Sequence, residues 1–210
     1  MRYDTQRNPQ QYPTMRNPAR NLMLPALLLL ALTLGLLTSN GARAEKADAN
    51  QPTHIEADHM DYDDLKQVNT FTGNVKLVRG TLTIRGQKMV ITQDASGYQL
   101  GTVYGSPAHF RQKRDGGPNL WTEGQGERIE HDSKTEITKF FTRAKMKRLE
   151  GTKVTDEVHG EFISYDARKE FYSVNNTASG QSKPGAGRVK VVLQPREDKK
   201  KSADGKNKGQ

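Results

Sequence analysis

Histidine and acidic side chains gather in one short stretch, where His59 lies among Asp58, Asp61 and Asp63. Imidazole and carboxylate groups are common ligands of divalent metals, so this stretch is a candidate metal cluster. A solvated strand face that ends in a turn explains the same residues, because aspartate is a frequent turn residue. We favour that second interpretation, and the sequence therefore predicts no metal site.

No catalytic constellation is present in the sequence. The five histidines are scattered, at positions 54, 59, 109, 131 and 159, and there is no cysteine for thiolate chemistry or for cysteine-ligated zinc. A nucleophile elbow, a phosphate-cradling glycine loop and a zinc-binding helix motif are all missing. Trp121 follows a glycine-rich turn, and an anchor in the core or at its rim is favoured over a sugar-stacking ring. The sequence predicts a protein that is not an enzyme and needs no cofactor.

A repeated pattern of bulky residues is the most informative feature. Four seven-residue segments, 57–63, 86–92, 126–132 and 160–166, have bulky side chains at their fourth and sixth places. Residues two apart in a strand point to the same face. A second short segment follows each of the four, and the unit recurs after 29, 40 and 34 residues. Unrelated strands could match by chance, but four matches in register predict a stacked or rolled all-β architecture of repeated short strand pairs.

The bulky positions would form one continuous apolar face. That face could close as an ordinary core or stay accessible to a lipid, and the residues alone leave both possibilities open. His131 takes the place that Tyr62 and Tyr165 hold in other repeats, so we interpret it as a ring of this face. The candidate lipid-groove residues are Met60, Tyr62, Phe71, Val75, Leu77, Leu82, Ile84, Met89, Ile91, Phe110, Ile129, Phe140, Met146, Ile163 and Tyr165.

The N-terminus predicts export. Arg16 and Arg20 precede an apolar run at 22–37, and the small residues Ala42 and Ala44 precede a cleavage point after Ala44. This is the pattern of a secretory signal peptide. An uncleaved membrane anchor is the alternative, but the run is short for a span of about 20 apolar residues. Translation could begin at Met15, since a peptide from there to Ala44 has ordinary signal length.

Cleavage changes the charge balance of the chain. The full sequence has 33 basic and 24 acidic residues, and the first 44 residues hold five of the former and one of the latter. The exported chain would therefore carry 28 against 23, a net charge of +5, which suits an anionic ligand or membrane surface. The predicted parts are a signal peptide (1–44), a lead-in (45–53), a β-jellyroll (54–178), a linker with a terminal edge strand (179–195) and a disordered basic tail (196–210).

Several motifs resemble the OstA-like family of lipopolysaccharide transport proteins. The resemblance covers nearly all of the chain after Ala44, and Thr142–Arg143 departs from it where the family favours Gly–Asn. The motifs are QPTHIEAD at 51–58, TFTGNV at 70–75, GSPAHF at 105–110, GEFISY at 160–165 and GRVKVVLQP at 187–195.

The resemblance implies an open antiparallel β-jellyroll in the periplasm that shields the acyl chains of lipopolysaccharide (lipid A). It implies end-to-end strand pairing with further copies, with inner-membrane-anchored LptC and with the outer-membrane insertase LptD. Nucleic acid is not expected as a partner, because basic residues do not alternate with exposed aromatic rings. A sugar-binding, lectin-like protein is the alternative. The expected assembly edges are Thr53, Ile55 and Asp58 at the N-terminal end and Val189, Val191 and Leu193 at the C-terminal end.

Overall fold

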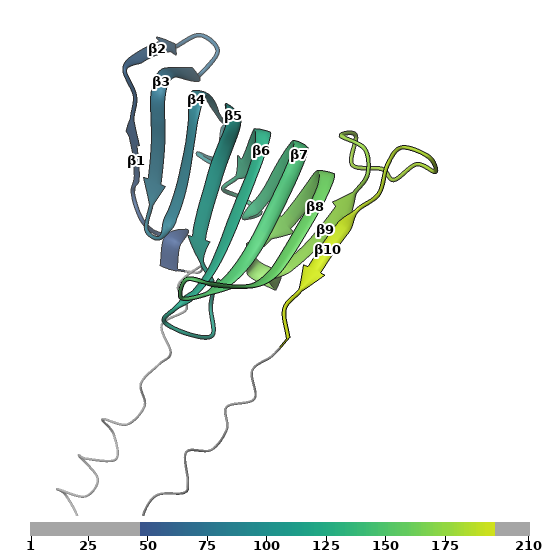
Figure 1. The fold of residues 1–210 in the computed structure, drawn as a ribbon. Coiled ribbons are helices and arrows are strands. Elements are labelled where there is room, and N and C mark those ends of the chain that lie inside the picture. Colours follow the sequence, from purple (N-terminus) through teal and green to yellow (C-terminus); the bar gives the residue numbers. More distant parts are fainter. Residues whose placement is uncertain (1–46, 196–210) are drawn as a thin grey trace, which may run out of the picture. The chain divides into compact units, whose positions relative to one another are not determined.

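The computed structural model describes residues 47–195, so the predicted signal peptide with its cleavage point at Ala44, and the predicted tail 196–210, lie outside the described residues. The described part is one antiparallel sheet of ten strands with a short 3₁₀ helix, Ala167–Lys169 (Figure 1). The strands are β1 (Thr53–Glu56), β2 (His59–Asp63), β3 (Val68–Arg79), β4 (Leu82–Gln93), β5 (Gln99–Lys113), β6 (Leu120–Asp132), β7 (Ile137–Glu150), β8 (Lys153–Asp166), β9 (Phe171–Asn175) and β10 (Lys190–Leu193).

Consecutive long strands are neighbours in the sheet, from β3 to β8. Each end of the sheet is completed by two short strands that follow one another along the last long strand. β1 and β2 both pair with β3, and β9 and β10 both pair with β8. The sheet is therefore open, with an unpaired edge at either end of the described chain.

Every long strand changes register near its middle, and these irregularities divide the sheet into two walls. The first wall holds β1, β10 and the halves of the long strands next to them, and the second wall holds β2, β9 and the other halves. In β3 the pairing with β4 shifts between Thr72 and Val75, where Gly73 and Asn74 have positive φ values of 78° and 48°. Bulges of this kind bend a strand and strengthen its twist, which lets one sheet fold over itself.

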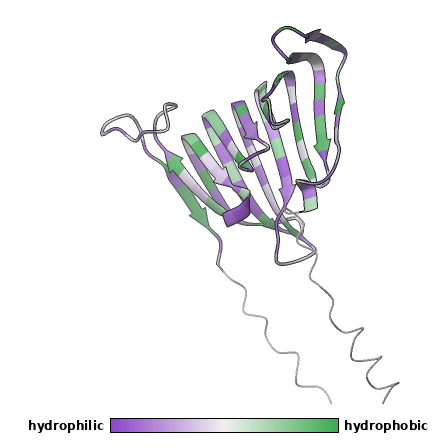
Figure 2. Ribbon diagram, turned by 180° about the vertical axis from the view of Figure 1, so that it is seen from behind, coloured by the Kyte–Doolittle hydropathy of each residue, from purple (hydrophilic) through white to green (hydrophobic). Residues whose placement is uncertain are grey.

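The core lies between the two walls, because apolar side chains alternate with polar ones along the strands (Figure 2). Opposed residues of neighbouring strands form two apolar rows that cross the sheet, one on each wall. The edge-on contact of Phe110 and Phe140, with ring centroids 5.5 Å apart, joins the rows. The first-wall row is Ile55, Leu77, Ile84, Phe110, Gly124, Met146, Val158 and Val191. The second-wall row is Met60, Phe71, Met89, Val103, Ile129, Phe140, Ile163 and Val174.

The predicted all-β fold and its repeat are confirmed, with one difference in strand length. The four repeat segments fall in β2, β4, β6 and β8, and the segments that follow them fall in β3, β5, β7 and β9. Strands β3 to β8 are longer than the predicted short segments, because each of them continues through its bend into the other wall. Strands β2 and β9 are short, as expected.

The predicted linker after β9 is an ordered loop. The Asn176 amide nitrogen donates hydrogen bonds to the carbonyl oxygens of Lys183 (2.8 Å) and Gly187 (3.0 Å), and its oxygen accepts one from the Lys183 backbone N–H (2.9 Å). These bonds return the chain to the sheet edge, where β10 pairs with β8. Within residues 47–195 no helix is long and apolar enough to cross a membrane.

Candidate functional site

The predicted groove residues converge on the interior between the walls. Thirteen of the fifteen are buried, all except Met60 and Tyr62. Sequence reasoning missed Val103, Ala108 and Val158, which are also buried in this core. Val103 lies opposite Met89 and Ile129 in the same row, so strand register was the signal that could have found it.

Met60 and Tyr62 point toward the same face as the core but lie at its edge. Their exposed fractions are 50% and 51%, because no strand lies beyond β2 to cover them. Met60 is opposite Phe71, so it is the exposed end of the second-wall row. The C-terminal end matches it, since Val191 ends the first-wall row and Leu193 beside it is also exposed. The apolar interior thus reaches both free edges of the sheet.

The interior is closed in this structure. The cavity lined by Leu77, Leu82, Met89 and Val103 has a volume of about 20 Å³. A space of this size holds about one water molecule. The core side chains between the walls have exposed fractions of 9% or less, so a hydrocarbon chain can enter only if the two walls move apart.

A buried ion pair closes the seam where the free sides of the two walls meet. Arg79 ends β3 on the first wall, and Glu136 precedes β7 on the second. The Arg79 Nη2 donates to both carboxylate oxygens of Glu136, at 2.9 and 2.7 Å. The exposed fractions of the two side chains are 8% and 4%. Burial raises the pKa of Glu136, and the Arg79 guanidinium opposes that shift.

His131 is part of the same seam cluster. Its Nε2 lies 3.0 Å from Arg79 Nη2 and its Nδ1 lies 3.0 Å from the Thr138 hydroxyl. A guanidinium can only donate, so we assign Nε2 as the acceptor and Nδ1 as the protonated nitrogen. Burial, with the positive charge of Arg79, lowers the pKa of His131 from 6.5 to about 3. The ring is therefore neutral. It is 6% exposed and lines the interior cavity, as expected of a ring of this face.

Further polar contacts cross the seam toward the C-terminal end of the sheet. Arg114 lies 3.6 Å from the Glu170 carboxylate, and the Arg148 guanidinium stacks 4.9 Å from the Tyr172 ring centroid. Arg148 also donates to the Glu170 carbonyl oxygen at 3.4 Å. In each of these contacts the arginine belongs to the first wall and its partner to the second. Polar side chains therefore line the seam on both walls. We call these two polar borders of the apolar interior its lips.

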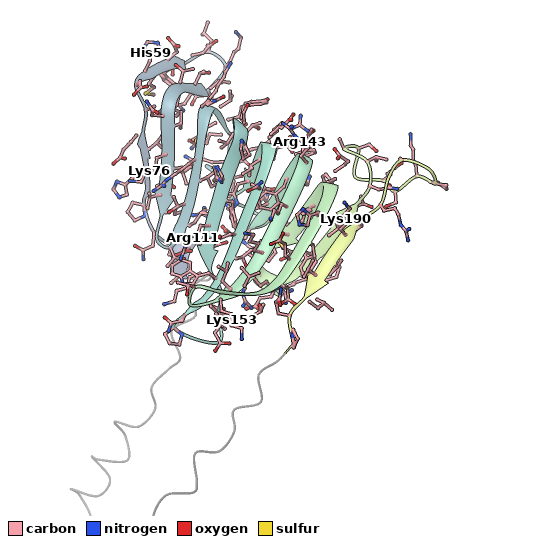
Figure 3. The ribbon with its side chains drawn as sticks, in the orientation of Figure 1. His59, Lys76, Arg111, Arg143, Lys153 and Lys190 are labelled. Atoms are coloured by element: carbon pink, nitrogen blue, oxygen red, sulfur yellow. The ribbon has the colours of Figure 1, made fainter. Side chains whose placement is uncertain are left out.

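The two ends of the sheet differ in charge. Around β1 and β2 the chain carries acidic residues, whereas the approach to β10 carries basic ones. Figure 3 marks Lys190 on β10, at the end of the sheet opposite His59 on β2. The acidic residues are Glu56, Asp58, Asp61, Asp63 and Asp64, accompanied by Lys66, and the basic residues are Lys183, Arg188 and Lys190.

The predicted assembly residues lie at these ends. Thr53 and Ile55 belong to β1, and Asp58 follows it, with its backbone N–H bonded to the Gly73 carbonyl oxygen at 3.0 Å. At the other end, Val191 and Leu193 belong to β10, and Val189 directly precedes it. Both edge strands keep one side unpaired within residues 47–195.

The outward backbone groups of β10 follow from its register. The Gln194 N–H donates to the Thr155 carbonyl oxygen at 3.0 Å. Because hydrogen-bonded residues alternate in an antiparallel ladder, Val192 also bonds to β8, while the N–H groups of Val191 and Leu193 point away from the sheet. This edge can therefore accept another strand.

Two other predicted features are ordinary in structure. His59 lies 3.2 Å from Asp61 on an exposed strand, and among residues 47–195 no group of three or more histidine, aspartate or glutamate side chains could hold a metal ion. The Trp121 ring is partly buried and is covered by the Arg111 guanidinium, 4.3 Å from the ring centroid.

A sheet folded over an apolar interior, sealed by polar lips and open at two edges, defines the class of open β-jellyrolls. Within that class the chain belongs to the family described as LptA/(LptD N-terminal domain) LPS transport protein, whose model matches residues 54–171.

Named relatives agree with this membership. The chain is 32% identical over 170 residues to the lipopolysaccharide export system protein LptA of Haemophilus influenzae, covering 80% of this chain and 91% of that protein. It is 31% identical over 140 residues to LptA of Escherichia coli K12, covering 66% and 71%. The crystal structure of LptH, the LptA-homologous periplasmic component of the lipopolysaccharide transport device of Pseudomonas aeruginosa, matches with a TM-score of 0.63 and 26% identity, over 71% of this chain and 99% of that one.

Proposed function

We propose that this chain is a periplasmic lipopolysaccharide carrier that holds the acyl chains of lipid A between its two walls. Each chain would form one segment of a bridge between the inner and outer membranes. The observation that carries the proposal is the pair of apolar rows, which run across the whole sheet and end at exposed side chains, Met60 on one edge and Val191 on the other.

An apolar path that reaches both edges is what lipid transport through water requires. Burying one methylene contributes about 0.8 kcal/mol, so exposing an acyl chain of about ten methylenes costs roughly 8 kcal/mol. Lipid A carries several such chains, and its acyl chains therefore need continuous cover. Rows that stop inside a closed domain could not hand the lipid on.

The closed interior defines how the carrier would work. Its 20 Å³ cavity excludes an acyl chain, so the lipid would replace contacts between the walls as the seam opens. The walls would hinge apart along the line of bends, where the register of strand pairing is already interrupted. Polar lips then allow the saccharide part to remain in water while the acyl chains lie inside.

The free edges and their charges support end-to-end assembly. An unpaired edge strand is a template for a strand of another chain. The acidic N-terminal end would meet the basic C-terminal end of the next copy, which favours one direction of stacking. By the family relationship, the N-terminal edge would pair with inner-membrane-anchored LptC and the C-terminal edge with another copy or with the outer-membrane insertase LptD.

Photo-crosslinking tests the lipid path. A photoreactive residue at Met60 lies at the exposed end of the second-wall row, where replacing the side chain leaves the core intact. The same residue at neighbouring Asp61, which points to the opposite face, is the matched control. We expect lipopolysaccharide to be captured from Met60 and not from Asp61. A second pair, Met89 inside and Lys88 outside, asks the same question in the middle of the row.

Equal capture from both members of each pair would contradict the proposal, because the lipid would then not distinguish inside from outside. Competition separates the lectin-like alternative. Lipid A without sugar extensions should compete for the Met60 site, whereas free saccharide should not. Competition by saccharide alone would identify a sugar-binding protein.

A further inference from the structure

The Arg79–Glu136 pair is an unusual way to close an apolar interior. Taking two charges out of water costs a free energy that their mutual attraction often fails to return, and two apolar side chains commonly hold such a contact as well. The pair is nevertheless almost completely buried, between walls that must separate for a lipid to enter. This points to a use for one of the charges in the open form.

Arg79 has unused capacity to bind an anion. Its bonds to Glu136 and His131 come from Nη2, whereas its Nε is buried without a hydrogen-bond partner. The side chain also lines the small interior cavity, together with Gln99 and Ser133. A guanidinium offers several donors in a planar fork that fits phosphate oxygens.

The distribution of charge along the seam favours an anion on the first wall. Arg79, Arg114 and Arg148 all belong to that wall, whereas Glu136 and Glu170, their partners across the seam, belong to the second. The buried Asp48 carboxylate also lies at the first wall, where its hydrogen bonds come from Thr81 and Gln112. Arg168 is the positive charge near Glu136 on the second wall. Separation of the walls would therefore leave a row of arginines on one lip. An amphiphile whose acyl chains lie inside would place its polar group at this lip.

We propose that Arg79 is a phosphate-binding residue of the seam, held by Glu136 in the closed form and taken over by a phosphate of the bound amphiphile when the walls part. This inference rests on the proposed function and adds to it the chemical group that the seam recognises. A phosphate replaces the carboxylate with equivalent charge-assisted bonds, so Arg79 is not left without a counter-charge as the interior opens.

The test compares two lipids and two double variants of the full chain. The lipids are a diphosphorylated lipid A and the same lipid A after enzymatic removal of both phosphates. The seam variant is Arg79→Gln with Glu136→Gln, which removes both charges. The matched control is Arg111→Gln with Glu123→Gln, an exposed cross-strand pair 2.6 Å apart on the first wall. Circular dichroism and urea unfolding establish that each variant is folded.

We expect the unmodified protein to bind the phosphorylated lipid about tenfold more tightly, since hydrogen bonds to charged groups commonly contribute that much. The seam variant should lose this preference while it still binds the dephosphorylated lipid, and the control should keep the preference. Arg79→Leu with Glu136→Leu provides the same comparison if the glutamine pair does not fold.

The outcomes separate the two proposals. A folded seam variant that keeps the preference of the unmodified protein would overturn the role of Arg79 and leave the carrier proposal intact. An unmodified protein that binds neither lipid would overturn the carrier proposal itself.

Discussion

Arg79 and Glu136 lie 57 residues apart in the sequence and join the two walls of the sheet through bonds of 2.9 and 2.7 Å. Arg79 lies at the end of β3 and Glu136 in the turn that precedes β7, so no backbone pairing brings them together. Their contact depends on the sheet folding over at its line of bends. It is a direct sign that the seam is shut.

Removing one charge of the Arg79–Glu136 pair should destabilise the fold more than removing both. Glu136→Gln leaves Arg79 buried without a counter-charge, and we expect a loss of about 3–5 kcal/mol in the free energy of unfolding. Arg79→Leu combined with Glu136→Leu should be close to neutral or stabilising. Urea unfolding measures both. The exposed Arg111→Gln change should cost less than about 1 kcal/mol. Equal losses for the single and double seam variants would contradict this account.

His131 should make the protein less stable in mild acid. The folded ring takes up a proton only near its lowered pKa of about 3, whereas the unfolded ring does so near 6.5. Because the unfolded state then binds more protons, the contribution of His131 is complete above 6.5 and is lost as the pH falls toward 3. By pH 4 the loss should be about 3 kcal/mol.

Urea unfolding at pH 7 and pH 4, with His131→Gln as the comparison, isolates this effect. Glutamine can still accept from Arg79 but does not titrate, so the variant should lose less stability on acidification. The charged groups around His131 are Arg79, Asp132 and Glu136. Burial raises the pKa of Glu136, so its own contribution runs in the opposite direction and remains in the variant. An unchanged pH slope in His131→Gln would refute the assignment.

Thr142 should be a strained position that glycine relieves. Its φ is 61° and that of Arg143 is 52°, the same left-handed pair that Gly73 and Asn74 adopt in β3. The Gly–Asn bend is thus retained in β7 although its residues differ. The left-handed conformation costs a side-chain-bearing residue about 1–2 kcal/mol. Thr142→Gly should therefore stabilise the fold by roughly 0.5–1 kcal/mol, after the greater freedom of glycine in the unfolded chain is subtracted.

The reverse change, Gly73→Ala, provides the comparison. Alanine at position 73 would have a strained positive φ, and its Cβ would collide with the Asp58 carboxylate. We expect a loss of at least about 1 kcal/mol in thermal or urea unfolding. The two variants must change the free energy of unfolding in opposite directions. Destabilisation by Thr142→Gly would show that the threonine side chain has a compensating role.

Val191→Pro should weaken end-to-end association and leave the single chain folded. The Val191 N–H points away from β8, so proline removes a donor from the free edge. Loss of one backbone bond and the bulk of the ring should lower the association constant about tenfold. Val192→Pro is the matched control, since it removes a donor to β8 and should detach β10 within the chain. If light scattering shows unchanged oligomers for Val191→Pro, the free edge of β10 is not the site of association.

The sequence alone determined the strand pattern and its repeat, because the alternation of bulky and polar residues follows directly from the two-residue period of a strand. Met89, Ile129 and Ile163 could be placed on one face from spacing alone, and the structure has them in one row. The motif resemblance also pointed to the right family. These features are local, or repeat locally, so no knowledge of distant contacts was needed.

Only the tertiary structure decided whether that face is open or closed. The volume of the interior cavity, about 20 Å³, depends on how far the sheet folds over. The bends and the contacts between the walls together determine that folding. Arg79 and Glu136 belong to different repeats and occupy strand ends, where periodicity carries no signal, so their pairing could not be read from the residues. Met60 and Met89 hold the same place in their repeats, yet one is half exposed and the other buried, because β2 lies at the edge and β4 does not. Burial depends on neighbours in the sheet, and only the folded chain supplies them.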